Sequence, residues 1–120
     1  MSGRLSEEFR ARTKLFAARV IRLFVRLPRG LEHVEIFGKQ LLRSATSVAA
    51  HVREASRSRS DAEFISKLGG ALQETDESQL WLELLREECG IPPESTQSLE
   101  QEANELIAIM TTMINRTKNK

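Results

Sequence analysis

Apolar residues recur every three or four positions along most of the chain, and this spacing predicts helices. Prolines and glycines interrupt the pattern in only a few places, so the predicted helices are long and their joins are short. Short joins make neighbouring helices antiparallel. The expected fold is therefore all-α: one domain, residues 1–120, forming an antiparallel up-down-up-down four-helix bundle with helices at about residues 6–27, 33–55, 61–88 and 94–116.

The helix expected at 33–55 contains the stretch around which the chain is organised, residues 40–54. Its apolar face is made by Val34, Phe37, Leu41, Ala45, Val48, Val52 and Ala55. Small residues lie on and beside this face, namely Ser44, Ala45, Ser47, Ala49 and Ala50. Because small side chains shorten the distance at which two helices pack, we expect this helix to be central and mostly buried.

The helix expected at 61–88 carries two apolar stripes, one through Phe64, Leu68 and Leu82 and a second through Ile65, Leu72 and Trp81. Two stripes require two partners, which we interpret as the helix's own bundle and a neighbouring subunit. Phe24 widens the stripe of the first helix in the same way. The candidate oligomer contacts are therefore Phe24, Ile65, Leu72 and Trp81.

Two adjacent glycines, Gly69 and Gly70, fall in the middle of that third helix. Each costs about 1 kcal/mol of helix stability relative to alanine. Their presence indicates close backbone packing at this point, and a kink is the alternative.

Composition narrows the class of protein. The chain is 40% hydrophobic and 29% charged, which is ordinary for a globular domain. The lone Cys89 excludes an internal disulfide framework and fits a reducing compartment. The N-terminus has no secretory signal, and arginines interrupt the apolar segment 16–27, so we expect a cytoplasmic protein without a membrane partner.

The net charge is only +1, but it is unevenly distributed. Residues 1–30 carry eight Lys or Arg against two acids, whereas residues 61–91 carry two against eight. One side of the first helix collects Arg12, Arg19, Arg22 and Arg26. This side is either a solvated basic face or a stripe that contacts the phosphates of a nucleic acid.

A second basic segment lies at the end of the second helix and in the loop after it, where Arg53, Arg57 and Arg59 fall within seven residues and serine alternates with arginine from 56 to 60. This loop is either a solvated linker or a flexible phosphate-binding loop. Residues 116–120 are also basic, and we expect this tail to fray.

Catalytic and metal-binding signatures are missing from the sequence. His33 and His51 have no second ligand at a suitable spacing, and Glu74 and Glu77 lack the histidine and the repeat that di-iron bundles use. We therefore expect no enzyme, no metal and no cofactor. The polar residues of the central helices, Arg43, Glu54, Glu74 and Glu77, are interpreted as a structural network in which Arg43 bridges carboxylates and fixes the register.

One motif resembles a known family. The pattern begins with Gln40-Leu41-Leu42-Arg43-Ser44-Ala45-Thr46-Ser47-Val48 and continues with Val52, Glu54, Glu63-Phe64-Ile65, Ala71, Glu74, Glu77-Ser78 and Trp81-Leu82. It is similar to proteins first noticed as reading frames in intervening sequences of 23S ribosomal RNA genes. It is also similar to the accessory subunit of diversity-generating retroelements. Where the family commonly has Asn-Ile-x-Glu-Gly, this chain has residues 51–55, His-Val-Arg-Glu-Ala.

The resemblance implies a four-helix bundle that assembles into a ring-like homopentamer with a basic surface, binding RNA or DNA and a reverse transcriptase. Two hypotheses follow. The first is a non-enzymatic, oligomeric nucleic-acid-binding accessory protein. The second is a structural protein-interaction scaffold whose charges serve only solubility and subunit pairing.

Overall fold

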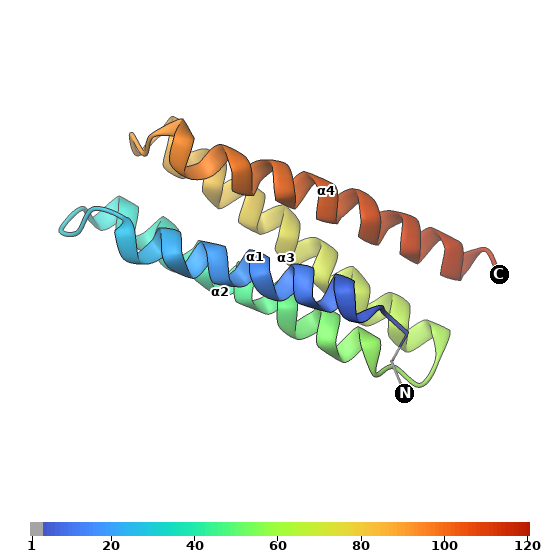
Figure 1. Ribbon diagram of the computed structural model, residues 1–120. Helices are drawn as coiled ribbons and strands as arrows, with labels where there is room; N and C mark the ends of the chain where they lie inside the picture. Colours follow the sequence, from blue (N-terminus) through green and yellow to red (C-terminus); the bar gives the residue numbers. More distant parts are fainter. Residues whose placement is uncertain (1–3) are drawn as a thin grey trace.

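The computed structural model describes residues 4–120, and over this range it contains four helices and no strand. They are α1 (Glu7–Arg26), α2 (Glu32–Ser56), α3 (Asp61–Glu87) and α4 (Pro93–Lys118). Figure 1 shows the four helices running alternately in opposite directions. The prediction of an all-helical, four-helix chain is confirmed. The basic tail differs from expectation, because α4 continues to Lys118 instead of fraying from residue 116.

Helix boundaries follow from local capping. The Ser6 hydroxyl accepts a hydrogen bond of 3.1 Å from the backbone N–H of Phe9 at the start of α1, and Ser60 accepts one of 3.1 Å from Glu63 at the start of α3. Such caps are worth about 1 kcal/mol each. Gly90 lies in the turn between α3 and α4. Its φ of +72° is the left-handed conformation, which glycine adopts without strain.

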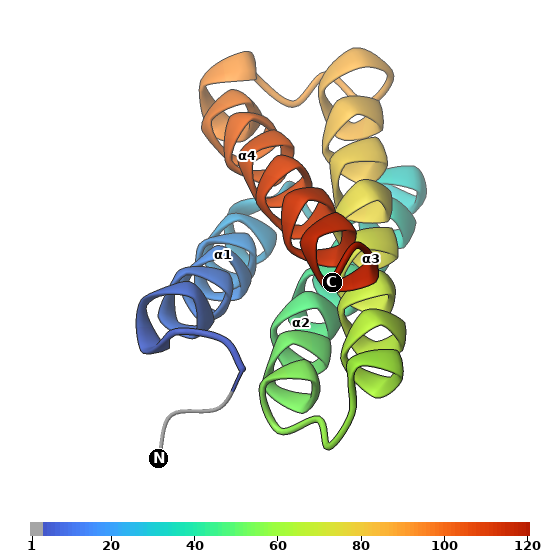
Figure 2. The same ribbon diagram turned by 90° about the vertical axis from the view of Figure 1, so that its right-hand side faces the viewer.

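The helices pack in chain order, and the pairs differ in how closely they contact each other. The pair α2–α3 has the most extensive contact, and α1–α4 has the least. Figure 2 shows the consequence: the start of α1 and the end of α4 stand apart at the end of the bundle that faces the viewer. Every helix contributes to one core, whose largest fully buried side chains include Phe16, Leu41, Leu68, Leu106 and Met110.

Small residues bring α2 and α3 together. Ser44 and Ser78 are fully buried, and their hydroxyl oxygens are hydrogen-bonded to each other at 2.8 Å. The polar groups are thus satisfied inside the core, where an unpaired hydroxyl would be costly. The predicted central position of the small-residue stretch in α2 agrees with this contact, and the apolar face of α2 is buried except at Phe37, which is half-buried.

The two mid-helix glycines have different surroundings. A Cβ atom added to Gly70 would lie 2.6 Å from Cδ2 of His51, whereas one added to Gly69 would meet nothing within 4 Å. The His51 ring is held in place by a 2.8 Å hydrogen bond between its Nδ1 and the Ser47 carbonyl oxygen. α3 passes through both glycines as one helix. Close packing, the first interpretation of the pair, therefore applies at Gly70 and not at Gly69.

Substituting the two glycines separately tests this difference. We expect Gly69→Ala to raise the free energy of unfolding by about 1 kcal/mol, because it adds helix propensity without a clash. Gly70→Ala should lower it by about 1 kcal/mol, because displacing the anchored His51 ring outweighs the same gain in propensity. Chemical denaturation of both variants beside the wild type measures the pair, and equal changes of the same sign would contradict the packing described for Gly70.

Candidate nucleic-acid interface

The arginines predicted on α1 differ in what they contact. Arg12 donates to both carboxylate oxygens of Glu102 at 2.8 Å and to Glu105 at 3.0 Å, so it ties α1 to α4. Arg19 donates to the Ser98 hydroxyl, also on α4. Arg22 is exposed, and so is the side chain of Arg26, whose Nε donates to the Arg22 carbonyl oxygen.

The Arg12 pair is a structural contact. Glu102 is mostly buried, with 17% of its side chain exposed, and its bidentate hydrogen bonds raise the pKa of Arg12. Because carboxylates already bind the Nε and Nη2 atoms of its guanidinium, Arg12 is poorly placed to contact phosphate. Of the four helix pairs that are in contact, it spans the least extensive one.

The predicted polar network on the central helices forms in part. Arg43 on α2 donates to Glu74 at 3.0 Å and to Glu77 at 3.1 Å, both on α3. Burial and the neighbouring Glu74 raise the pKa of Glu77, and Arg43 opposes that shift. Glu54 does not join this group; it pairs with Lys67 at 3.1 Å, and that hydrogen bond lowers the pKa of Glu54.

The two predicted arginine clusters do not form one surface. Arg22 and Arg26 lie in the last turns of α1, beside the turn into α2, whereas Arg57 and Arg59 lie in the turn between α2 and α3. Figure 1 places these turns at opposite ends of the bundle, whose longest dimension is 48 Å. Arg53, in the last turn of α2, belongs with the second cluster. A single short ligand cannot therefore contact both clusters on one chain.

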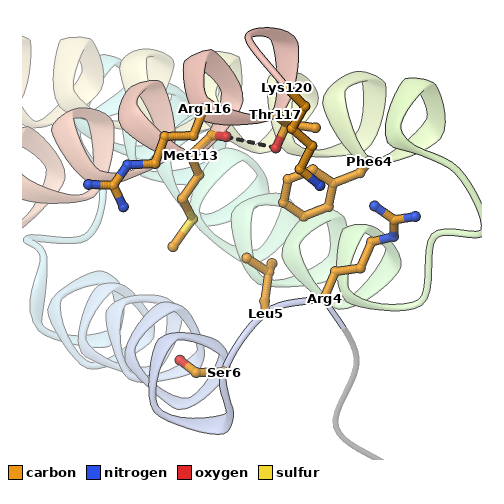
Figure 3. A pocket seen from close by; sticks show the side chains of 8 residues that line it. All are labelled: Arg4, Leu5, Ser6, Phe64, Met113, Arg116, Thr117 and Lys120. Carbon is orange, nitrogen blue, oxygen red and sulfur yellow. Dashed lines mark hydrogen bonds between the residues drawn. The ribbon is translucent and has the colours of Figure 1, made fainter.

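The cluster at the α2–α3 turn gains three cations that sequence reasoning did not select, Arg4, Arg116 and Lys120. They line a cavity of about 410 Å³ together with Leu5, Ser6, Phe64, Met113 and Thr117 (Figure 3). Arg4 joins this cavity to the serine-arginine turn, because its backbone N–H donates to the Ser56 carbonyl at 2.9 Å and its Nε to the Ser58 carbonyl at 3.1 Å. We call this region, with Arg57 and Arg59, the basic end.

No local pattern in the sequence identifies these three residues as part of a site, because they lie near the two ends of the chain. Arg4 precedes the first helix, and Arg116 and Lys120 lie in the segment expected to fray. They come together only in the folded chain: the segment before α1, the start of α3 and the end of α4 lie at the same end of the bundle (Figure 2), and residues from all three line the cavity. No acid lines the cavity, although Asp61 beside it pairs with Arg4 at 2.7 Å and Lys120 at 3.6 Å. The hydrogen bond from Arg4 is the main reason that the pKa of Asp61 is lowered.

The opposite end of the bundle holds a larger cavity of about 670 Å³ with a different character. Its lining includes leucines, prolines and Cys89, with one cation, Arg26, and one acid, Glu94. Burial raises the pKa of the Cys89 thiol, which makes it a poor nucleophile. Within residues 4–120 no group of three or more His, Cys, Asp or Glu side chains is arranged to hold a metal ion.

The predicted oligomer contacts are only partly exposed. Trp81 stacks on Phe37 with ring centroids 5.7 Å apart, and Ile65 and Leu72 pack against the core. Phe24 is also half-buried. The large apolar residues with the most exposed surface are others, namely Leu15, Ile21, Val25, Leu31, Ile36 and Leu80. Ile21 and Val25 lie one turn apart on α1. Of these exposed residues, they are the pair that helical spacing alone could have identified as an apolar patch.

Comparison with known proteins places this fold and sequence in a family. A family model described as 23S rRNA-intervening sequence protein matches residues 8–112. The chain belongs to the 23S rRNA-intervening sequence protein family. A crystal structure of a protein with unknown function from the S23 ribosomal protein family of Bacteroides thetaiotaomicron VPI-5482 is similar to it, with 34% sequence identity and a TM-score of 0.80.

That similarity covers 88% of this chain and 94% of the Bacteroides chain. The comparison with curated proteins found no match. The predicted resemblance to the 23S rRNA-intervening sequence family is thus confirmed. No helix within residues 4–120 has both the length and the apolar character needed to cross a membrane.

A further ion pair holds α3 to α4 and gives a pH-dependent prediction. Arg86 donates to both oxygens of Glu100 at 2.9 and 2.8 Å, and only 14% of the Glu100 side chain is exposed. The hydrogen bonds from Arg86 lower the pKa of Glu100 from its ordinary value of 4.5. The pair therefore stabilises the folded chain above pH 4.5, and this contribution is lost as the pH falls through the lowered folded-state pKa.

Glu100→Gln should lower the free energy of unfolding by about 1–2 kcal/mol near neutral pH, with the difference from wild type shrinking below about pH 4.5. Urea denaturation across that pH range measures it. Glu94→Gln is the matched control, because Glu94 is exposed and forms no ion pair within residues 4–120. If the difference in unfolding free energy between Glu100→Gln and the wild type does not change with pH, the role given to the Glu100 carboxylate is contradicted.

Proposed function

We propose that this protein is a non-enzymatic, oligomeric nucleic-acid-binding accessory protein that contacts RNA or DNA through its basic end. The observation that carries the proposal is the convergence of Arg4, Arg116 and Lys120 around one cavity, beside the exposed Arg57 and Arg59. Arginine and lysine grouped on one surface supply the phosphate contacts that dominate affinity for nucleic acids.

The pairing of charges supports this choice of surface. Arg57, Arg59 and Arg116 form no ion pair with another side chain in residues 4–120, whereas Arg12 and Arg43 are each bound to two carboxylates. An arginine already held by an acid must lose that bond before it contacts phosphate. The basic end therefore offers cations at a lower cost than the middle of α1 does.

Self-association is part of the proposal. Each chain offers only a small basic surface, and a ring-like homopentamer would present five copies to one polyanion and raise the apparent affinity by multivalency. Exposed apolar residues such as Ile21, Val25 and Leu80 supply surface for subunit contacts. We place the assembly in the cytoplasm, and by the family resemblance a reverse transcriptase is the candidate protein partner.

The same exposed apolar residues favour a second candidate function. If they pair subunits or bind other proteins while the charges only maintain solubility, the protein is a structural interaction scaffold. The two functions differ in a simple observable, because a scaffold has no salt-dependent affinity for nucleic acid.

Charge variants at the two ends of the bundle test the proposal. Anisotropy of a labelled structured RNA, and of a DNA of the same length, is measured against salt for the wild type and for Arg57→Gln/Arg59→Gln/Arg116→Gln. We expect the wild type to bind, with affinity falling steeply as salt rises, and the variant to bind at least tenfold more weakly with a smaller salt slope. Each lost phosphate contact reduces the slope by about 1.

The matched control removes the same charge from the opposite end: Arg22→Gln/Arg26→Gln/Arg29→Gln. We expect it to retain most of the wild-type affinity, because these arginines lie in the last turns of α1 and in the turn that follows, and that turn is at the opposite end of the bundle (Figure 1). An equal loss in both triple variants would overturn the assignment to the basic end. Absence of wild-type binding at low salt would overturn the function and leave the scaffold.

A further inference from the structure

The cavity of the basic end has an apolar middle between two cationic sides. Leu5 and Phe64 are nearly fully buried and form its floor, with the half-buried Met113 beside them. Figure 3 shows the Arg116 guanidinium on one side of these residues and the Arg4 guanidinium on the other. The guanidinium carbon of Arg4 lies 5.9 Å from the centre of the Phe64 ring, so Arg4 also covers an edge of the floor.

The side chains on each cationic side carry a net positive charge. On one side Asp61 is shared by Arg4 and Lys120, so one carboxylate faces two cations. On the other side Arg116 has no acidic partner in the described part of the chain, and it also lines a second, separate pocket with Ile109 and Thr112. Acids of the first helical turns, Glu7, Glu8 and Glu63, are exposed and do not line the cavity.

We propose that this cavity holds one unstacked nucleotide of a bound strand. The base lies against Leu5, Met113 and Phe64, the phosphate on one side of it meets Arg116, and the phosphate on the other side meets Lys120 and Arg4. This assignment rests on the proposed function, and it adds that the protein distinguishes unpaired from paired nucleotides. Asp61 acts as a positioning residue that holds Arg4 and Lys120 at the rim.

The arrangement matches a nucleotide in three respects. A nucleotide within a strand carries a base with apolar ring faces, flanked by two phosphates, and the cavity has an apolar middle flanked by two cationic sides. Its volume of about 410 Å³ lies within the range of small-ligand pockets, about 300–1,000 Å³. The Thr117 hydroxyl, which donates to the Met113 carbonyl at 2.9 Å, keeps a lone pair for a base N–H.

A base can enter this open cavity only if it leaves its stack. A base in a blunt duplex is paired and stacked, and extracting it costs a few kcal/mol, whereas a base in a single strand is available at little cost. Backbone contacts alone would not prefer the single strand, because a duplex has the higher density of phosphates.

Filling the cavity without changing its charge tests the proposal. The probes are a labelled 12-nucleotide single-stranded RNA, a DNA of the same sequence, and the blunt duplex of each, at one moderate salt concentration. We expect the wild type to bind each single strand about tenfold more tightly than its duplex. Thr117→Trp should abolish this preference while leaving duplex affinity within about twofold.

Thr111→Trp is the matched control, since it places the same side chain on an exposed position of α4 that does not line the cavity. It should keep the wild-type preference, and thermal melting should show that both variants are folded. If the preference for single strands is the same with RNA and with DNA, the base and the phosphates are what the cavity recognises. A preference that differs between RNA and DNA supports the cavity as well if Thr117→Trp removes the difference.

Four results would overturn the nucleotide cavity. A wild type that binds single strands and duplexes equally, a Thr117→Trp variant that keeps the preference, or a Thr111→Trp control that also loses it would each contradict the cavity while leaving nucleic-acid binding in place. Displacement of the RNA from the wild type, but not from Thr117→Trp, by a glutamate-rich peptide at equal concentration would assign the cavity to an acidic peptide. If no probe binds at low salt, the proposed function fails first.

Discussion

Close contact between α2 and α3 is the constraint on which the rest of the bundle depends. Small side chains at Ser44 and Ser78 let the two helices approach until their hydroxyl groups hydrogen-bond at 2.8 Å inside the core. Gly70 leaves room for the ring of His51 at the same interface. Since α1 packs on α2, and α4 packs on α3, this central pair sets where the two outer helices lie.

The outer helices meet only weakly, and this has consequences for function. Arg12 and Arg19 link them through side-chain hydrogen bonds, and the contact between the two helices is the least extensive of the four packed pairs. At the end of the bundle where the chain begins, α1 and α4 stand apart, and the basic cavity opens between them (Figure 2). The same divergence that reduces the core thus provides the candidate binding surface.

Local patterns in the sequence predicted most of the fold. Helical spacing depends on residues within a few positions of each other, and the four helices that it predicted are the four that the structure has. The serine caps at Ser6 and Ser60 and the turn at Gly90 are equally local features. Arg43 was correctly expected to bridge carboxylates, because the register of adjacent antiparallel helices limits its partners.

The binding surface was predicted less well, because charge in a sequence does not show which charges are already paired. Arg12 was placed with the phosphate contacts but is bound to two acids more than 85 residues away along the chain. Arg4, Arg116 and Lys120 were missed because only the folded chain brings its two ends together. Which apolar side chains remain exposed depends on how the helices cross. Trp81 is more covered than its position in the second stripe indicated, because it stacks on Phe37.

The most direct test of the account is the mass of the protein in solution, by light scattering on a sizing column, with and without a structured RNA. We predict a particle of about five times the 13.6 kDa chain mass that gains the mass of the RNA at low salt and releases it as salt rises. A particle of one chain mass, or an assembly whose mass is unchanged by RNA at every salt concentration, would contradict the central claim of an oligomeric nucleic-acid-binding protein.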